Sequence, residues 1–226
     1  MYFEPTYYLF MIPAFVILII AQIMVKSRFS KYSKISGKRG LTGAAAASAI
    51  LRQHGVTDVK IEPCRGKLTD HFDPKAKVIR LSEPVFDSTS IAAIGVACHE
   101  AGHALQYNEG YAPIRIRAAM IPLTRFSPYV SIALMAIGYA LALFQLVWIG
   151  IAFFSLVFIL QLVTLPVEFN ASRRALESIG QFDFLDDREM KGAKSVLSAA
   201  AMTYVAAMLQ SLLQLLYFVA RASRRR

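Results

Sequence analysis

His99-Glu100-Ala101-Gly102-His103 lies inside an Ala-rich run that opens after Ser90 and continues to Gln106. The run predicts a helix, because nothing between Ile91 and Ala97 breaks one and Ser90 offers a side-chain oxygen as an N-cap. The two histidines are four residues apart, so a helix places both imidazoles on one face. The surrounding fold is expected to be built around this helix.

The His-Glu-x-x-His spacing carries specific chemistry. Two imidazoles at this spacing can bind one Zn²⁺ at about 2.0–2.1 Å per nitrogen. Glu100 is rotated by about 100° from His99, so it flanks the metal, where a carboxylate can take a proton from bound water. This is the arrangement of metal-dependent peptidases. The pattern predicts His99 and His103 as ligands of one Zn²⁺ per chain and Glu100 as the catalytic base.

The composition points to a membrane protein. The chain has 226 residues, 56% of them hydrophobic, with a mean hydropathy of +0.46, which is too apolar for a soluble domain of this length. The net charge is +10, but the basic residues cluster beside apolar runs. That placement favours membrane orientation and argues against a nucleic-acid partner. The two cysteines, Cys64 and Cys98, do not form a disulfide framework.

The N-terminal segment, 1–25, is predicted to be a transmembrane helix. Tyr7 to Val25 carries no charge and is about long enough to span a bilayer core. Aromatic side chains that could form an interfacial belt stand at its start: Tyr2, Phe3, Tyr7 and Tyr8. Six cations between Lys26 and Arg39 follow it, and the positive-inside rule places them in the cytoplasm.

Residues 26–126 are predicted to form a cytoplasmic α+β zinc-binding catalytic domain. Thr42 to His54 should be a helix, Val59 to Glu62 and Val78 to Leu81 short strands, and Asp70 to Pro74 a turn between them. Val78 to Leu81 is expected either to edge the cleft and pair with substrate backbone or to act as ordinary support.

Residues 127–167 are predicted to be a transmembrane helical hairpin. The uncharged run is long enough for two bilayer crossings, roughly Tyr129–Phe144 and Leu146–Leu165, turning near Gln145. Both ends then lie on the same side of the membrane. The polar segment 168–194, a helix and loop, returns to the side that carries the motif histidines.

The last segment, 195–226, is an apolar helix with a basic tail. It is predicted to be either a fourth transmembrane span or an interfacial helix, so the fold has three to four transmembrane helices. Thr203, Gln210 and Gln214 share a stripe at spacings of seven and four. Such a stripe suits a membrane-protein partner or a second copy of the chain.

A tetrahedral zinc that keeps a water needs a third protein ligand. Glu168 is the best candidate, because it is the first ionisable residue after the hairpin and is returned to the metal's side. Ser172, four residues later, shares its helical face and could accept the ring N–H of a zinc-bound histidine. Five other carboxylates are expected to be solvated: Glu109, Glu177, Asp183, Asp186 and Asp187.

Four stretches together resemble the YugP-type membrane zinc metallopeptidases of bacteria. They are Gly66 to Pro74, Arg80 to Pro84, His99 to Gln106 and Glu168 to Ser172. The order of metal motif, two transmembrane helices and ligand glutamate is also similar to the HtpX-type quality-control proteases, whose sites face the cytoplasm. In those relatives an Asp stands where this chain has Ser172. The resemblance implies peptide hydrolysis and leaves the target open.

The predicted fold is therefore an integral membrane, mainly α protein with a small zincin-like α+β domain that carries the motif helix. The predicted function is zinc-dependent endopeptidase activity on membrane or membrane-proximal polypeptides. Two other functions stay open, a non-catalytic zinc-stabilised membrane scaffold and an intramembrane-cleaving protease. The oxyanion-stabilising residue is also open among Tyr107, His71 and Arg173, and no role is assigned to Asp70 or Cys64.

Overall fold

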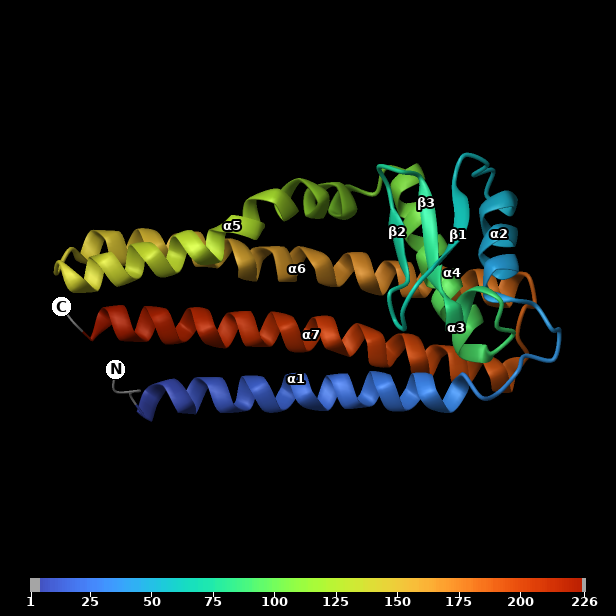
Figure 1. Ribbon diagram of the computed structural model, residues 1–226, viewed down its shortest axis with the longest axis horizontal. Helices are drawn as coiled ribbons and strands as arrows, with labels where there is room; N and C mark the ends of the chain where they lie inside the picture. Colours follow the sequence, from blue (N-terminus) through green and yellow to red (C-terminus); the bar gives the residue numbers. More distant parts are fainter. Residues whose placement is uncertain (1–4, 225–226) are drawn as a thin grey trace.

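The computed structural model describes residues 5–224, and these are mostly helical. Its elements, in chain order, are α1 (Pro5–Tyr32), α2 (Gly43–Gln53), β1 (Lys60–Cys64), β2 (His71–Asp73), β3 (Val78–Ser82), α3 (Glu83–Phe86), α4 (Ile91–Asn108), α5 (Ala112–Ala140), α6 (Phe144–Gln181) and α7 (Asp187–Ser223). Two residues of the predicted aromatic belt, Tyr2 and Phe3, and two of the predicted basic tail, Arg225 and Arg226, lie outside this range. Figure 1 shows the long helices lying side by side, with a small domain at one end.

Four of the described helices, α1, α5, α6 and α7, are long and apolar enough to cross a membrane. They lie side by side in the order α5, α6, α7, α1, with contacts between successive neighbours (Figure 1). A mainly helical chain with three to four apolar helices was expected, and the structure confirms this much. The small domain, made of α2, α3, α4 and the sheet, packs at one end of these helices.

The long helices extend well beyond their uncharged stretches. α1 continues past residue 25 to Tyr32, α6 runs past Glu168 to Gln181, and α7 begins at Asp187. The hairpin turn lies at residues 141–143 and not near Gln145 as predicted. Hydropathy marks where a helix would leave lipid, whereas the backbone hydrogen bonds continue through polar residues.

α7 packs along α6 and α1 and is one of the four candidate spans. Near its C-terminal end, Ala222 joins a buried cluster with Met135, Val147 and Ile151 of the α5–α6 hairpin. This packing favours the expected fourth span over an interfacial helix. Of the predicted polar stripe, Thr203 donates a hydrogen bond to the Ala200 carbonyl of its own helix (2.7 Å).

The sheet differs from the prediction in one strand. Asp70 to Pro74 is not a turn, because His71–Asp73 forms β2, which pairs antiparallel with β3. The turn comes later, where the Asp73 carboxylate accepts hydrogen bonds from the backbone of Lys75 (3.0 Å) and Ala76 (3.1 Å).

The strand order is β1-β3-β2, with β1 parallel to β3. β3 is therefore the central strand, and both of its edges are already paired. Of the two alternatives for Val78 to Leu81, edging the cleft is therefore excluded, and ordinary support of the sheet agrees with the central position of β3. The edge strand beside α4 is β2.

The core of the small domain forms around α4. Ile50 of α2, Ile79 and Leu81 of β3, and Ile94 and Leu105 of α4 are almost fully buried. The predicted N-cap is confirmed, since the Ser90 hydroxyl accepts a hydrogen bond from the Ala93 backbone (3.2 Å). Residues from α6 and α7 complete the core, so the small domain and the long helices share it.

Candidate metal centre

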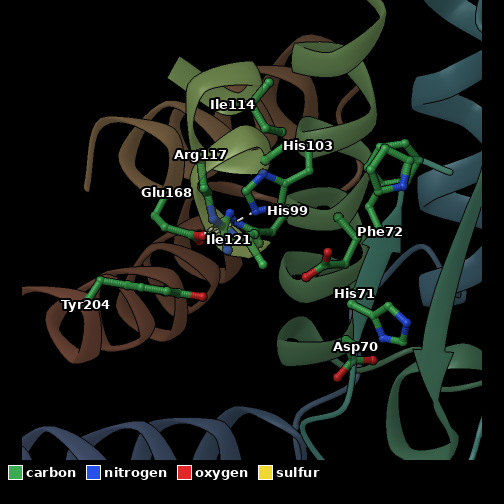
Figure 2. Close-up of a pocket in the computed structure, with 13 residues that line it drawn as sticks. Asp70, His71, Phe72, His99, His103, Ile114, Arg117, Ile121, Glu168 and Tyr204 are labelled. Atoms are coloured by element: carbon green, nitrogen blue, oxygen red, sulfur yellow. Dashed lines mark hydrogen bonds and ion pairs between the residues drawn. The ribbon is translucent and has the colours of Figure 1, made fainter. Parts of the chain in front are cut away.

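α4 presents His99 and His103 on one face, and α6 brings Glu168 against them (Figure 2). Glu168 Oε2 lies 3.3 Å from His99 Nε2 and 3.5 Å from His103 Nε2. One potential ligand atom from each residue lies within 4.8 Å of the others. The structure therefore brings together three groups that are separated by the membrane hairpin in the sequence.

The environment of Glu168 fits a bound cation. The side chain is 2% exposed, and Oε2 has no hydrogen-bond partner within the described residues. The other oxygen, Oε1, accepts a hydrogen bond from Arg117 of α5 (3.0 Å). A buried carboxylate oxygen that faces two imidazole nitrogens is costly unless a cation or a proton satisfies it. Two histidines and one glutamate are a known donor set for catalytic zinc.

The surroundings of His103 change the pKa of its ring. Burial works against a charged ring, but the carboxylates of Glu168, 3.5 Å from Nε2, and of Glu100 favour the charged form and outweigh burial, so the pKa of His103 is raised. A proton and a metal ion compete for the same ring nitrogen. Metal binding at this site should therefore release protons and become tighter as the pH rises.

A buried glutamine fixes the orientation of His103. The Gln106 amide nitrogen donates to the carbonyl of Val167 (2.8 Å) and to Asn170 Oδ1 (2.9 Å). Its oxygen must then face His103 Nδ1, 3.0 Å away, which places the ring proton on Nδ1. The lone pair of Nε2 is thereby left to face Glu168.

The hydrogen bonds that link His103, Gln106 and Asn170 continue to the surface of the protein. Asn170 Oδ1 also accepts a hydrogen bond from Arg174 (2.7 Å), whose guanidinium binds both carboxylate oxygens of Glu109 at 2.7 Å. Glu109 is therefore paired and is not merely solvated as expected. The pair with Arg174 also lowers the pKa of Glu109. Sequence reasoning missed Gln106 and Asn170, although the position of Gln106, three residues after His103, was a usable signal.

Two further contacts align α4 with α6. Ser172 Oγ lies 3.1 Å from His99 Nδ1, so the predicted contact between this serine and a motif histidine is present. Gly102 allows the helices to approach closely, because a Cβ at this position would lie 2.7 Å from the Ala171 carbonyl oxygen. The glycine inside the motif therefore lets Glu168 reach the two histidines.

The three groups lie at the wall of a cavity of about 230 Å³. Glu100 lines the same cavity and is 7% exposed. β2 contributes His71 and Phe72, α5 contributes Arg117 and α7 contributes Tyr204. Arg117 and Tyr204 were both missed, because the sequence marked their segments only as a basic amphipathic stretch and an apolar helix.

Of the other residues singled out in the sequence, Tyr107 and Arg173 lie outside this cavity, whereas Asp70 lines it. Tyr107 borders a different cavity and packs edge-on against Phe72, and Arg173 is paired with Glu177 on α6. Asp70 accepts hydrogen bonds from the Ser82 backbone (2.7 Å) and hydroxyl (3.0 Å), which ties the start of β2 to the end of β3.

Neither cysteine belongs to the cluster of His99, His103 and Glu168. Cys64 lies on β1, where its thiol contacts Thr69 Oγ1 at 3.5 Å. Cys98 is fully buried, and burial raises the pKa of its thiol, so the uncharged form is favoured there.

Comparisons with known proteins agree with this chemistry. The family described as "Putative neutral zinc metallopeptidase" matches residues 7–223. The chain is 50% identical over 199 residues to "Putative membrane protease YugP" of Bacillus subtilis (strain 168), and the alignment covers 88% of each chain. No solved structure matches the chain. The similarity extends over the long helices as well as the site.

Proposed function

The chain belongs to the neutral zinc metallopeptidase family, and on that premise we propose that it is a membrane-embedded zinc endopeptidase with a zincin-like catalytic domain. One observation carries the proposal. A buried, unpartnered carboxylate oxygen of Glu168 faces the Nε2 atoms of both motif histidines, at the wall of a cavity that Glu100 also lines.

In this proposal His99, His103 and Glu168 hold one zinc ion per chain. Zinc bound there would lower the pKa of water and polarise the scissile carbonyl. Glu100 accepts the proton that the attacking water loses and delivers it to the amide nitrogen that leaves. Gln106 and Ser172 keep the two imidazoles oriented during these steps.

The substrate is proposed to be a polypeptide of a membrane or membrane-proximal protein. β2 is an edge strand at the cavity, so an extended substrate segment can add its backbone to it. The cavity is also lined by residues of α5, α6 and α7, three of the four candidate spanning helices. A bond near the membrane surface would therefore be close to the site.

The two alternative functions receive less support. A structural zinc site has no use for a carboxylate that lines the cavity without ligating the metal, as Glu100 does in this proposal. An intramembrane protease would carry the motif within a span, but α4 has 18 residues and is buried in the core of the small domain.

Metal removal tests the proposed function. Purified protein loaded with zinc should cleave fluorescently labelled casein, used as an unstructured polypeptide. A chelator should abolish the cleavage, and added zinc should restore it, because the attacking water is activated only at the metal site. Cleavage that persists after complete metal removal, or no cleavage by the zinc-loaded protein, would contradict the proposal.

We further propose that the catalytic domain faces the cytoplasm, because basic residues cluster at its end of the helices. In a variant without Cys64 and Cys98, Asp58→Cys should resist a membrane-impermeant thiol reagent in intact cells. It should react after permeabilisation, since residue 58 is exposed.

A cysteine at the opposite end of the molecule is the matched control for this orientation. Leu141 is 63% exposed beside the hairpin turn, so Leu141→Cys should be labelled in intact cells. The reverse labelling pattern would show that the catalytic domain lies outside.

A further inference from the structure

The proposed peptidase reaction needs a hydrogen-bond donor for the carbonyl oxygen of the scissile bond, so the identity of that donor rests on the proposed function. This oxygen gains negative charge as water adds to the carbon, and a positioned donor stabilises that charge. Apart from the two motif histidines, the described side chains that line the cavity and can donate are His71, Arg117 and Tyr204.

Two of the three donors are poorly suited to the task. Arg117 already donates to Glu168 Oε1 at 3.0 Å, and this bond compensates a carboxylate that is 2% exposed. His71 Nδ1 contacts the Thr69 carbonyl oxygen (2.8 Å), and Figure 2 shows its ring turned away from the histidine and glutamate cluster. Arg117 therefore stabilises Glu168, the proposed third ligand, and His71 contacts the loop before β2.

The side chain of Tyr204 points in the direction that such a donor requires. It extends from α7 with its hydroxyl end pointing toward the cluster of His99, His103 and Glu168 (Figure 2). The phenol lines the same cavity as Glu100. A tyrosine also has few rotatable bonds, so it holds a donor in place at low entropic cost.

The packing of α7 supports this position. α7 contacts α4, and a Cβ at Gly95 of α4 would be in van der Waals contact with Ala193 of α7. On its other side, Gly192 of α7 leaves room for the ring of Tyr32 of α1. The helix that carries Tyr204 is therefore packed between α1 and the motif helix.

We propose that Tyr204 is a catalytic residue that donates a hydrogen bond to the scissile carbonyl oxygen as that oxygen gains charge. The phenol keeps its proton throughout. Glu100 transfers the proton lost by water to the leaving amide nitrogen. Proton transfer is thus the role of Glu100, and stabilisation of the charged oxygen is the role of Tyr204. The C-terminal helix thus supplies chemistry as well as a membrane span.

The test compares Tyr204→Phe with the wild-type protein in casein cleavage. Removal of the hydroxyl should lower kcat by about 10²–10³-fold, the usual effect of losing one such donor. KM and zinc affinity should stay close to wild type, because the lost contact forms mainly in the transition state and the ring remains. Tyr107→Phe is the matched control, because Tyr107 borders another cavity. The kcat of this variant should equal that of the wild-type protein.

Arg117→Gln separates the two roles that the structure assigns. It should weaken zinc binding, because Glu168 loses its partner, whereas Tyr204→Phe should not. An unchanged kcat in Tyr204→Phe, or a variant that loses zinc instead of kcat, would overturn the role of Tyr204. Lack of cleavage by zinc-loaded wild-type protein would instead refute the proposed function, and the role of Tyr204 with it.

Discussion

Glu100→Gln should lower kcat by about 10²–10⁴-fold, the range that a positioned general base contributes. Glutamine has nearly the same size as glutamate but cannot accept the proton that the attacking water loses. The side chain is 7% exposed and lines the cavity, so an isosteric replacement leaves the packing of α4 intact. Zinc content should stay at the wild-type level, because the three proposed ligands are untouched.

The measurement needs two readouts on the same sample. Casein cleavage reports kcat, and metal analysis with thermal unfolding reports zinc content and fold. Glu177→Gln is a suitable control, because Glu177 is 63% exposed and its ion pair with Arg173 spans 4.0 Å. Wild-type activity in zinc-loaded Glu100→Gln protein would end the proposal that this carboxylate is the base.

Local sequence signals predicted the motif helix well. Ser90 caps α4, and the four-residue spacing of the histidines puts both rings on one face, as a single turn of helix requires. The helix predicted from Thr42 to His54 rested on equally local signals, and α2 runs from Gly43 to Gln53 between these two residues. These features depend on residues within one or two turns of each other.

β2 could not be found in the same way. It has three residues, and its sequence, His71-Phe72-Asp73, is flanked by residues typical of turns. The strand exists because β3 offers it an edge, and the Asp73 side chain moves the turn to the residues after it. Pairing of this kind is a tertiary effect, so local propensity pointed to the wrong structure.

The residues missed around the site share one cause. Arg117 and Tyr204 lie on helices that hydropathy describes only as membrane segments, and Asn170 meets Gln106 across two helices. Their positions depend on how α5, α6 and α7 pack around α4. That packing relies in part on Gly102, whose missing side chain admits the α6 backbone. A single sequence shows the glycine but not the helix that approaches it.

Glu168→Gln should lower zinc affinity by at least about 100-fold, because losing even an outer hydrogen-bond partner of a metal ligand costs about 10–100-fold. The change replaces a negatively charged oxygen that faces both Nε2 atoms with a neutral amide, which is a poor partner for a dication. It also leaves Arg117 beside an amide where it had a carboxylate to bind. Competition with a chromogenic chelator measures the affinity directly.

Zinc should also cease to stabilise the Glu168→Gln protein. Zinc at about 100 times its Kd adds about 2.7 kcal/mol to the stability of a protein that binds it only when folded, so wild-type Tm should rise with zinc. The ligand lies on α6 and the histidines on α4, so this gain links the small domain to the long helices. Glu177→Gln, on the exposed face of α6, should keep both the affinity and the rise in Tm. If instead Glu177→Gln loses zinc while Glu168→Gln binds it as tightly as wild type, Glu168 is not a ligand and the buried oxygen of Glu168 needs a different cation.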